Sequence, residues 1–300
     1  MKDTVRILKA LLMTLRPKQQ YKNLLIFVGI VFSLNILNFS MWLNVISAFI
    51  IFCMLSGSGY IINDILDVEK DRQHPVKRRR PIASGELKIS HALVFSFVLI
   101  FVALSGAYLI NLKFFSISVL FILITLIYSF LLKHIILVDA LTISINFVIR
   151  AVAGCLAIGV YISPWLIVCA FLLALFLVFG KRRHELMLLG ESAERHRKIL
   201  KEYSVEMLEQ MISVITGALI VSYSMYTFMS GNSYMMLTIP FVIYGLFRYL
   251  FLIHTGNIGG EPEMIFRDRG MVICMVLWVV LVILILYGVL DVIVRVVGRG

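Results

Sequence analysis

Residues 42–71 read WLNVISAFIIFCMLSGSGYIINDILDVEKD, an apolar run that ends in a cluster of acidic residues. No charged side chain occurs in residues 42–62, and about 20 such residues in a helix are enough to cross a bilayer. The polar positions follow directly, at Asn63, Asp64, Asp67 and Asp71. Polar groups at membrane depth usually mark function, so the stretch predicts a transmembrane helix with a functional site at one end.

The rest of the chain has the same apolar character. Of its 300 residues, 61% are apolar and 15% are charged, with a mean hydropathy of +0.97, whereas soluble domains are nearer half apolar and a quarter charged. We therefore expect an all-α, polytopic membrane protein of about nine transmembrane helices. The expected spans are 24–39, 42–62, 92–110, 114–132, 137–159, 164–180, 207–229, 234–253 and 271–294. Without a soluble domain, repeat or low-complexity segment, residues 1–300 are expected to form a single integral membrane domain.

The basic residues predict the orientation of these spans. With alternating sides assigned along the chain, 23 of the 28 Lys and Arg residues lie on the side of the N-terminal arm, three lie on the other, and Arg150 and Arg248 lie within spans. This asymmetry places the N-terminus and the acidic cluster in the cytoplasm. The net charge of +11 suits anionic lipid headgroups and a phosphate-rich substrate. It does not indicate a nucleic-acid partner, because the basic residues lie in short loops between spans.

The spacing of the acidic residues indicates a metal site. Asn63, Asp67 and Asp71 follow one another at i, i+4 and i+8 on a helix, with Asp64 beside them. Carboxylates at that spacing repel one another, and a shared Mg²⁺ removes the repulsion, since it takes one or two carboxylates with substrate phosphate oxygens and water. We therefore predict these four residues as magnesium ligands and the three aspartates as catalytic. The alternative is a solvated acidic helix end that pairs with the basic loop behind it.

Several polar residues within spans or near their expected cytoplasmic ends are candidate substrate ligands. Lys77 and Arg80 follow Asp71 closely enough for a short loop to place them over the same site, where they could hold phosphate oxygens. Arg78 and Arg79, between them, are interpreted as topological signals. Further candidates are Asn63, Tyr128, Lys133, Asp139 and Arg150. The alternative roles are snorkelling for Lys133 and a structural ion pair with another helix for Asp139 and Arg150.

The motif NDxxDxxxD at 63–71, followed by KRRRPIASG at 77–85, resembles the UbiA superfamily of intramembrane prenyltransferases. This resemblance implies a UbiA-like helical bundle in which magnesium holds a diphosphate at a cytoplasmic-side active site. Prenyl-transferring members carry a second Asp-rich motif after the sixth span, and here the chain departs from them. It reads Gly180-Lys181-Arg182-Arg183-His184-Glu185-Leu186, which is basic instead of acidic.

This basic segment at 180–186 resembles the corresponding segment of the decaprenyl-phosphate phosphoribosyltransferase branch. The segments Arg16-Pro17-Lys18-Gln19 and Gly260-Glu261-Pro262-Glu263 resemble that branch as well. The branch implies transfer of a 5-phosphoribosyl group from phosphoribosyl diphosphate (PRPP) to a polyprenyl phosphate such as decaprenyl phosphate, with Mg²⁺ as cofactor and release of diphosphate. It also implies a bacterial inner membrane location and a role in cell envelope biosynthesis. The further substrate-binding residues are Lys22, Lys181, Arg182, Glu185 and Arg267, with Glu185 alternatively serving only to orient Arg182.

Two other functions stay open from the sequence, as does the oligomeric state, a homo-oligomer included. A UbiA-type prenyltransferase would move an isoprenoid from its diphosphate to an aromatic or other acceptor, and would need acidic groups after the sixth span. A lipid carrier or flippase would explain the spans and the basic face but not the four acidic-motif residues. Replacing Asp67 by Asn separates these classes, because a carrier would keep working whereas an enzyme would lose magnesium-dependent turnover.

Overall fold

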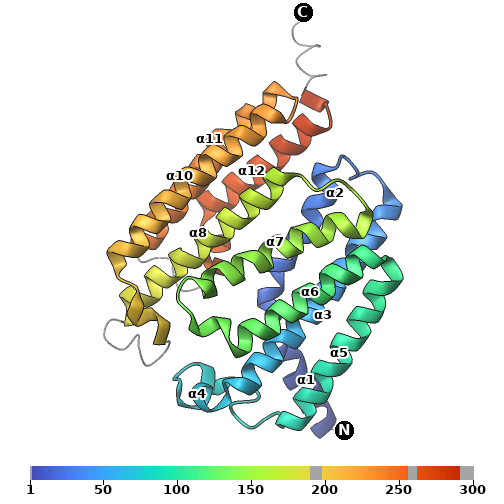
Figure 1. Cartoon of the computed structure of the whole chain (residues 1–300), viewed down its shortest axis with the longest axis vertical. Coiled ribbons are helices and arrows are strands. Elements are labelled where there is room, and N and C mark those ends of the chain that lie inside the picture. The colour runs from blue at the N-terminus through green and yellow to red at the C-terminus, as the bar shows by residue number, and fades with distance from the viewer. Residues whose placement is uncertain (1, 190–197, 256–261, 291–300) are drawn as a thin grey trace, which may run out of the picture. The chain divides into compact units, whose positions relative to one another are not determined.

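The computed structural model describes residues 2–189, 198–255 and 262–290 (Figure 1). Every regular element in these ranges is a helix, which confirms the predicted all-α class. The chain divides into two compact units, Met1–Ile162 and Ser163–Gly300. Each unit is described below by itself.

In the first unit, the long helix α3 (Phe39–Leu66) packs against α5, α6, α7 and the 3-10 helix η1. The other elements are α1 (Lys2–Thr14), η1 (Pro17–Phe27), α2 (Val28–Phe32), α4 (Val68–Gln73), η2 (Lys77–Arg79), α5 (Ile89–Ile110), α6 (Leu112–Phe130), η3 (Leu132–His134) and α7 (Val138–Ile158). Phe52 of α3 is fully buried, and its ring centre lies 5.8 Å from that of Phe114 and 4.9 Å from that of Phe121, both in α6. These rings fix α3 against α6 and so help to position the acidic end of α3.

A close approach of η1 to α7 also shapes the first unit. A Cβ added at Gly154 would lie only 2.0 Å from the backbone oxygen of Ile26, so only glycine permits the two backbones to come this close. The contact brings Asn23 of η1 against the middle of α7, where its side chain accepts a hydrogen bond from Arg150 at 2.7 Å.

The second unit is built from two helix pairs, α8 with α10 and α11 with α12. Its elements are α8 (Pro164–Leu189), η5 (Lys198–Glu202), α10 (Val205–Met229), η6 (Ser233–Thr238), α11 (Ile239–His254), η7 (Pro262–Arg267) and α12 (Arg269–Leu286). The buried Tyr223 hydroxyl joins three of these elements. It accepts a hydrogen bond from Trp278 Nε1 at 2.9 Å and shares one with the Thr238 hydroxyl at 2.7 Å.

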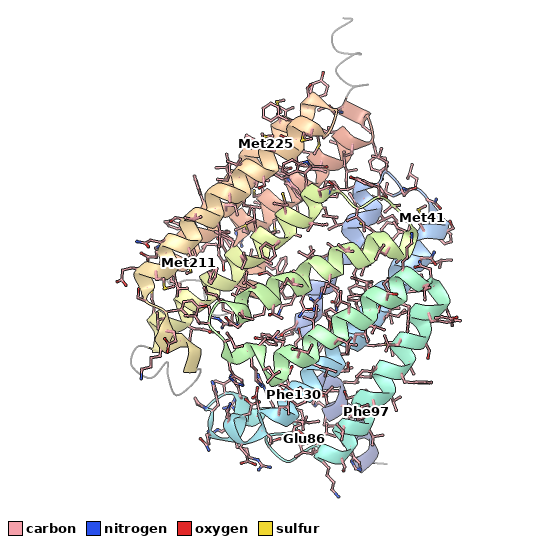
Figure 2. All side chains as sticks on the ribbon, in the orientation of Figure 1. Met41, Glu86, Phe97, Phe130, Met211 and Met225 are labelled. Atoms are coloured by element: carbon pink, nitrogen blue, oxygen red, sulfur yellow. The ribbon has the colours of Figure 1, made fainter. Side chains whose placement is uncertain are left out.

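Eight helices in the described ranges are long and apolar enough to cross a membrane. Apolar side chains project from their outer faces toward the expected lipid, such as Phe97 on α5 and Met225 on α10 (Figure 2), 62% and 44% exposed. The eight helices correspond to eight of the nine predicted spans, although residues 291–294 of the last predicted span lie outside the described residues.

The prediction of a continuous helix at 24–39 is wrong. This stretch contains the end of η1, the short α2 and a turn in which Leu34 has a φ of +62°, before α3 begins at Phe39. A positive φ at leucine is incompatible with a continuing right-handed helix. Hydropathy measures only how apolar a segment is, so it did not detect this break.

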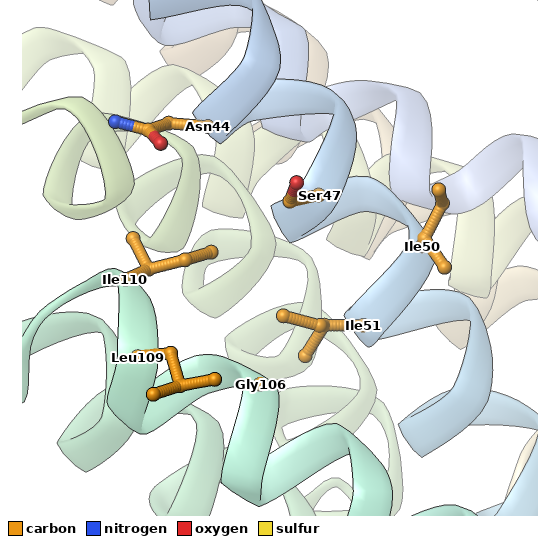
Figure 3. Close-up of a pocket in the computed structure, with 7 residues that line it drawn as sticks. All are labelled: Asn44, Ser47, Ile50, Ile51, Gly106, Leu109 and Ile110. Atoms are coloured by element: carbon orange, nitrogen blue, oxygen red, sulfur yellow. The ribbon is translucent and has the colours of Figure 1, made fainter.

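A groove of about 400 Å³ lies between α3 and α5 (Figure 3), lined by Asn44, Ser47, Ile50, Ile51, Gly106, Leu109 and Ile110. Ser47 precedes Asp64 by 17 residues in the same helix, a separation of roughly 26 Å at 1.5 Å per residue. The groove is therefore separate from the acidic cluster, and we assign it no role in the chemistry.

Candidate active site

The acidic motif occupies the junction between α3 and α4. The helical hydrogen-bonding pattern continues across that junction, since the Asp67 amide donates to the Asn63 carbonyl at 3.0 Å and the Asp71 amide donates to the Asp67 carbonyl at 2.8 Å. A helix turns by about 100° per residue, so position i+4 lies about 40° and i+8 about 80° around from i, while i+1 lies at 100°. Asp71 therefore lies beside Asp64 rather than above Asn63, and the structure divides the motif into two pairs.

The first pair, Asp64 and Asp71, is buried and held by two arginines. Arg80 Nη1 donates to Asp64 Oδ1 at 2.9 Å and to Asp71 Oδ2 at 2.5 Å. Arg16 Nη2 donates to the same Asp64 oxygen at 2.5 Å, and its guanidinium lies 4.9 Å from the centre of the Tyr60 ring. The two aspartates are 3% and 4% exposed, so the arginines supply the compensation that buried carboxylates require.

The second pair, Asn63 and Asp67, shares one lysine. Lys133 Nζ donates to both Asp67 carboxylate oxygens, at 2.8 and 3.0 Å, and to Asn63 Oδ1 at 3.3 Å. Lys133 lies in η3, directly after α6, and its side chain is 12% exposed. The lysine is therefore bound to the acidic motif and does not extend freely to the membrane surface.

The donor atoms of the motif suit Mg²⁺ in type, because all are carboxylate or amide oxygens. In the described part of the chain, however, no three acidic, histidine or cysteine side chains are grouped around a common point. The carboxylates instead surround the basic side chains of Arg16, Arg80 and Lys133. Three carboxylates and three cations thus form a charge-balanced cluster, in which a metal would take the place of a basic partner.

The other predicted residues of the first unit occupy varied positions. Lys77, half-buried in η2, donates its backbone N–H to His74 Nδ1 at 3.2 Å. Lys22 is half-buried with its Nζ 5.9 Å from the Tyr21 ring centre, and Tyr128 is half-buried near the end of α6. Asp139 is completely buried in the first turn of α7, where the helix dipole favours a negative charge. None of these contacts joins them to the acidic pairs.

Arg150 lies apart from that cluster, in the middle of α7, and is 6% exposed. It donates from Nε to Asn23 Oδ1 at 2.7 Å, from Nη1 to the Asn146 carbonyl at 2.7 Å, and from Nη2 to the Ser56 hydroxyl at 3.3 Å. Its guanidinium carbon also lies 4.7 Å from the centre of the Phe121 ring. All of these partners are neutral. The predicted alternative, an ion pair between Arg150 and another helix, is not formed within the described residues.

The predicted basic residues of the second unit are partly paired along α8. Arg182 donates to Glu185 at 2.8 Å and is 2% exposed, whereas Lys181 lies 3.8 Å from the same carboxylate and is 40% exposed at its side chain. Arg183 is buried and donates to Glu209 at 2.6 and 2.9 Å, which ties α8 to α10.

Arg267 is exposed at the end of η7. The neighbouring Asp268 accepts hydrogen bonds from Arg248 at 2.8 and 3.1 Å, which hold the pKa of the Asp268 carboxyl below its usual value. Gly260 and Glu261 of the predicted motif lie outside the described residues.

Three residues at these sites were not predicted as ligands: Arg16, Asn23 and Ser56. Arg16 was noted only as part of a resemblance, and its backbone has a φ of +50°, which is uncommon for a residue other than glycine. The only local sign was its position before Pro17, where an αR conformation is disfavoured. Asn23 and Ser56 gave no sign of their contact with Arg150, because that contact depends on three separate elements packing together.

The comparisons with known proteins identify the family. The chain matches the UbiA prenyltransferase family over residues 24–265. The chain belongs to this family. The match begins in η1 of the first unit and ends in η7 of the second, so the UbiA-family region covers most of each unit and includes the acidic motif.

Curated UbiA-family relatives resemble the chain over most of its length. The decaprenyl-phosphate phosphoribosyltransferase of Corynebacterium glutamicum is 30% identical over 284 residues, covering 91% of this chain and 85% of the relative. The enzyme of the same name from Mycobacterium tuberculosis is 32% identical over 274 residues, covering 88% and 90%. The resemblance predicted from the motifs is therefore confirmed.

A solved structure supports the UbiA fold. The UbiA homologue from Archaeoglobus fulgidus, bound to GPP and Mg²⁺, has a TM-score of 0.72, with 18% identity and coverage of 93% of this chain and 99% of the homologue. At this identity the likeness establishes the fold alone, which is that of a multi-pass helical membrane protein.

Proposed function

We propose that the chain transfers the 5-phosphoribosyl group of PRPP to a polyprenyl phosphate and releases diphosphate, with Mg²⁺ as cofactor. The observation that carries the proposal is the similarity to decaprenyl-phosphate phosphoribosyltransferases over about nine tenths of the chain, acidic motif included. In this proposal residues 1–300 act as one membrane transferase domain. Its N-terminus and active site lie on the cytoplasmic side of a bacterial inner membrane, as the distribution of Lys and Arg favours.

The acidic cluster provides groups suited to the leaving diphosphate. Mg²⁺, bound to Asp64, Asp67 and Asp71 with the amide oxygen of Asn63, would neutralise the charge that develops on the departing oxygen. The cluster already holds Arg16, Arg80 and Lys133 within hydrogen-bonding distance of these carboxylates. When diphosphate binds, these basic side chains can release a carboxylate and donate to a phosphate oxygen instead, so each keeps a negatively charged partner. They are therefore suited to hold the diphosphate.

The acceptor needs little activation by the protein. Departure of diphosphate from C1 builds positive charge on the ribose ring, as in glycoside hydrolysis. The attacking atom is a phosphate oxygen that is already ionised near neutral pH, because the second pKa of a phosphate monoester is ~6. We therefore assign no general base. Catalysis rests on positioning and on charge stabilisation, with inversion at C1 from attack opposite the diphosphate.

The test is an assay with the purified full-length chain, radiolabelled PRPP and polyprenyl phosphates of several lengths. The expected result is a labelled lipid that forms only when Mg²⁺ and the acceptor are both present. A parallel reaction replaces PRPP with a prenyl diphosphate and supplies an aromatic acceptor. Turnover there, with no labelled lipid from PRPP, would reject the proposal in favour of a prenyltransferase.

A further inference from the structure

The buried Arg150 of α7 differs from the other deeply buried arginines in the part of the chain that the structure describes. Arg182 and Arg183, 2% and 4% exposed, each pair with a glutamate. Arg150, 6% exposed, pairs with none in the described residues and is held by neutral oxygens and by the rings of Phe121 and Phe147. A cation within a membrane span is costly unless it has a counter-charge. Its persistence there calls for an anion that binds to it.

The guanidinium retains the hydrogens that such an anion would use. Nη1 and Nη2 each carry two hydrogens, and each makes one hydrogen bond, to the Asn146 carbonyl and to the Ser56 hydroxyl. One hydrogen therefore remains on each terminal nitrogen, and a phosphate can accept hydrogen bonds from both terminal nitrogens of an arginine.

The Arg150 guanidinium lies in the same unit as the acidic motif, and its distance from the motif can be estimated along α3. Its partner Ser56 precedes Asp64 by eight residues of α3, which is about 12 Å of helix rise and about 80° of rotation. The guanidinium is thus deeper in the membrane span than the diphosphate-binding end, and its contact on α3 is turned by about 80° from Asp64.

We infer that Arg150, with Asn23 and Ser56, forms a subsite within the membrane for a phosphate monoester group of a substrate. This inference rests on the proposed function, in which both substrates carry such a group: the 5-phosphate of PRPP and the phosphate of the polyprenyl acceptor. When the phosphate binds, the guanidinium exchanges neutral hydrogen-bond acceptors for a charged one. Arg150 is then a substrate-binding residue at a distance from the magnesium ligands.

The competing explanation is that Arg150 only ties η1, α3 and α7 together through its three hydrogen bonds. The two roles predict opposite effects on the ligand-free protein. If Arg150 is a structural tie, replacing it by Met removes the tie and the melting temperature falls. If Arg150 is an uncompensated buried cation, the same change removes an unfavourable charge. The melting temperature then stays the same or rises, as it can when apolar side chains replace buried charges.

The experiment compares Arg150→Met with Arg183→Met, the matched change at a buried arginine that has a glutamate partner. Melting temperatures of the full chain are measured in detergent without ligand, and again with ribose 5-phosphate or a short-chain prenyl monophosphate as probe. KM is measured separately for PRPP and for the polyprenyl phosphate. Arg150→Lys, which keeps the charge but not the two-pronged geometry, is the second variant if the Met variant does not fold.

The expected result is that Arg150→Met has a melting temperature at or above that of the wild type, while Arg183→Met is destabilised. The KM of one substrate rises at least tenfold, and stabilisation by the matching probe is lost. If the KM for PRPP rises, the group bound by Arg150 is the 5-phosphate of PRPP. If the KM for the polyprenyl phosphate rises, the group is the phosphate of the lipid acceptor. Arg150→Lys gives an intermediate KM.

Two results would overturn the inference: both KM values within twofold of the wild type, or a loss of melting temperature as large as that of Arg183→Met. Failure of the proposed function is recognised separately, because the wild-type chain then makes no labelled lipid. In that case the probe measurements still decide whether Arg150 binds a phosphate monoester.

Discussion

Replacing Arg80 by Gln tests whether the acidic motif is neutralised by basic side chains when no substrate is bound. Arg80 Nη1 contacts both buried aspartates, at 2.9 Å from Asp64 and 2.5 Å from Asp71. In the Gln variant Asp64 keeps Arg16, but Asp71 loses the cationic partner that the structure shows for it. We expect the variant to be less stable than the wild type in the absence of Mg²⁺.

The size of the effect follows from the geometry. Removing one partner from a buried ion pair costs about 3–5 kcal/mol, and a hydrogen bond to a charged group contributes about 1.5–3 kcal/mol. The Arg80 side chain is 26% exposed and the aspartate side chains are 3% and 5% exposed, so water compensates part of the loss. We therefore expect a destabilisation of about 2–4 kcal/mol. At roughly 2 °C per kcal/mol for a chain of this length, the melting temperature should fall by about 4–8 °C.

Arg79→Gln is the matched control, since Arg79 is exposed in the same basic loop and contacts neither aspartate. Both variants and the wild type are melted in detergent, with and without Mg²⁺. The metal should stabilise Arg80→Gln more than the wild type, because it need not displace the arginine from Asp64 and Asp71. Stabilisation by a ligand grows with its concentration relative to its Kd, so a Mg²⁺ titration reports the difference in affinity.

Two results would refute this reasoning. The first is an Arg80→Gln variant that melts at the same temperature as Arg79→Gln, which would mean that the ion pairs contribute nothing to stability. The second is a Mg²⁺ titration that shifts all three proteins equally, which would mean that Arg80 and the metal do not compete for the same carboxylates.

Three further predictions use other parts of the structure. Asp67→Asn replaces the carboxylate that pairs with Lys133, and the two side chains are 21% and 12% exposed. The variant should lose about 1–3 kcal/mol of stability and lower magnesium-dependent turnover at least about tenfold; equal turnover by the variant would contradict the assigned metal role. Gly154→Ala should lower the melting temperature and the yield of folded protein, because the new Cβ would lie 2.0 Å from the Ile26 oxygen and overpacking costs about 1–3 kcal/mol or more. The control Gly217→Ala, whose new Cβ would have no atom within 4 Å, should be neutral or stabilising. A Gly154→Ala protein as stable as Gly217→Ala would show that η1 does not pack against α7 as described. The Arg248 hydrogen bonds lower the pKa of Asp268, so the stability they contribute should be present above the unfolded-state pKa of about 3.9 and be lost as the pH falls through the lower folded-state pKa. The difference in melting temperature between wild type and Asp268→Asn should therefore be constant from neutral pH to about pH 5 and disappear only in stronger acid. A difference that disappears near neutral pH would contradict the lowered pKa.

Much of the fold could be predicted from the sequence because a bilayer imposes simple rules. A spanning segment must be helical and apolar to satisfy its backbone in lipid, so hydropathy found α3 and the seven long segments that follow it. The same rule failed at 24–39, where the segment is apolar but the backbone turns at Leu34. Hydropathy has no access to backbone angles, and no glycine or proline marked this turn.

The candidate site residues were predictable where their charge is unusual for their place in the chain. Asp64, Arg150 and Lys133 became candidates in this way, because a polar group in or beside a span needs an explanation. The partners were not predictable, since Lys133 is 66 residues from Asp67 and Asn23 is 127 residues from Arg150. Such contacts depend on how the helices pack, and nothing local in the sequence determines them.

The charged side chains of the first unit are arranged in two different ways. Asp64, Asp67 and Asp71 are matched by Arg16, Arg80 and Lys133, so the cluster is close to neutral before any ligand binds. A magnesium diphosphate adds a cation and an anion together, which changes this balance little and lets the existing ion pairs exchange partners. A phosphate monoester adds an anion alone, and the cation best suited to bind it is one that no carboxylate already holds. Among the buried arginines of the described chain, Arg150 meets that requirement. A substrate with both groups would therefore use the acidic end of α3 for its metal-bound part and the middle of α7 for the other, so substitutions at either place should raise the KM of that same substrate.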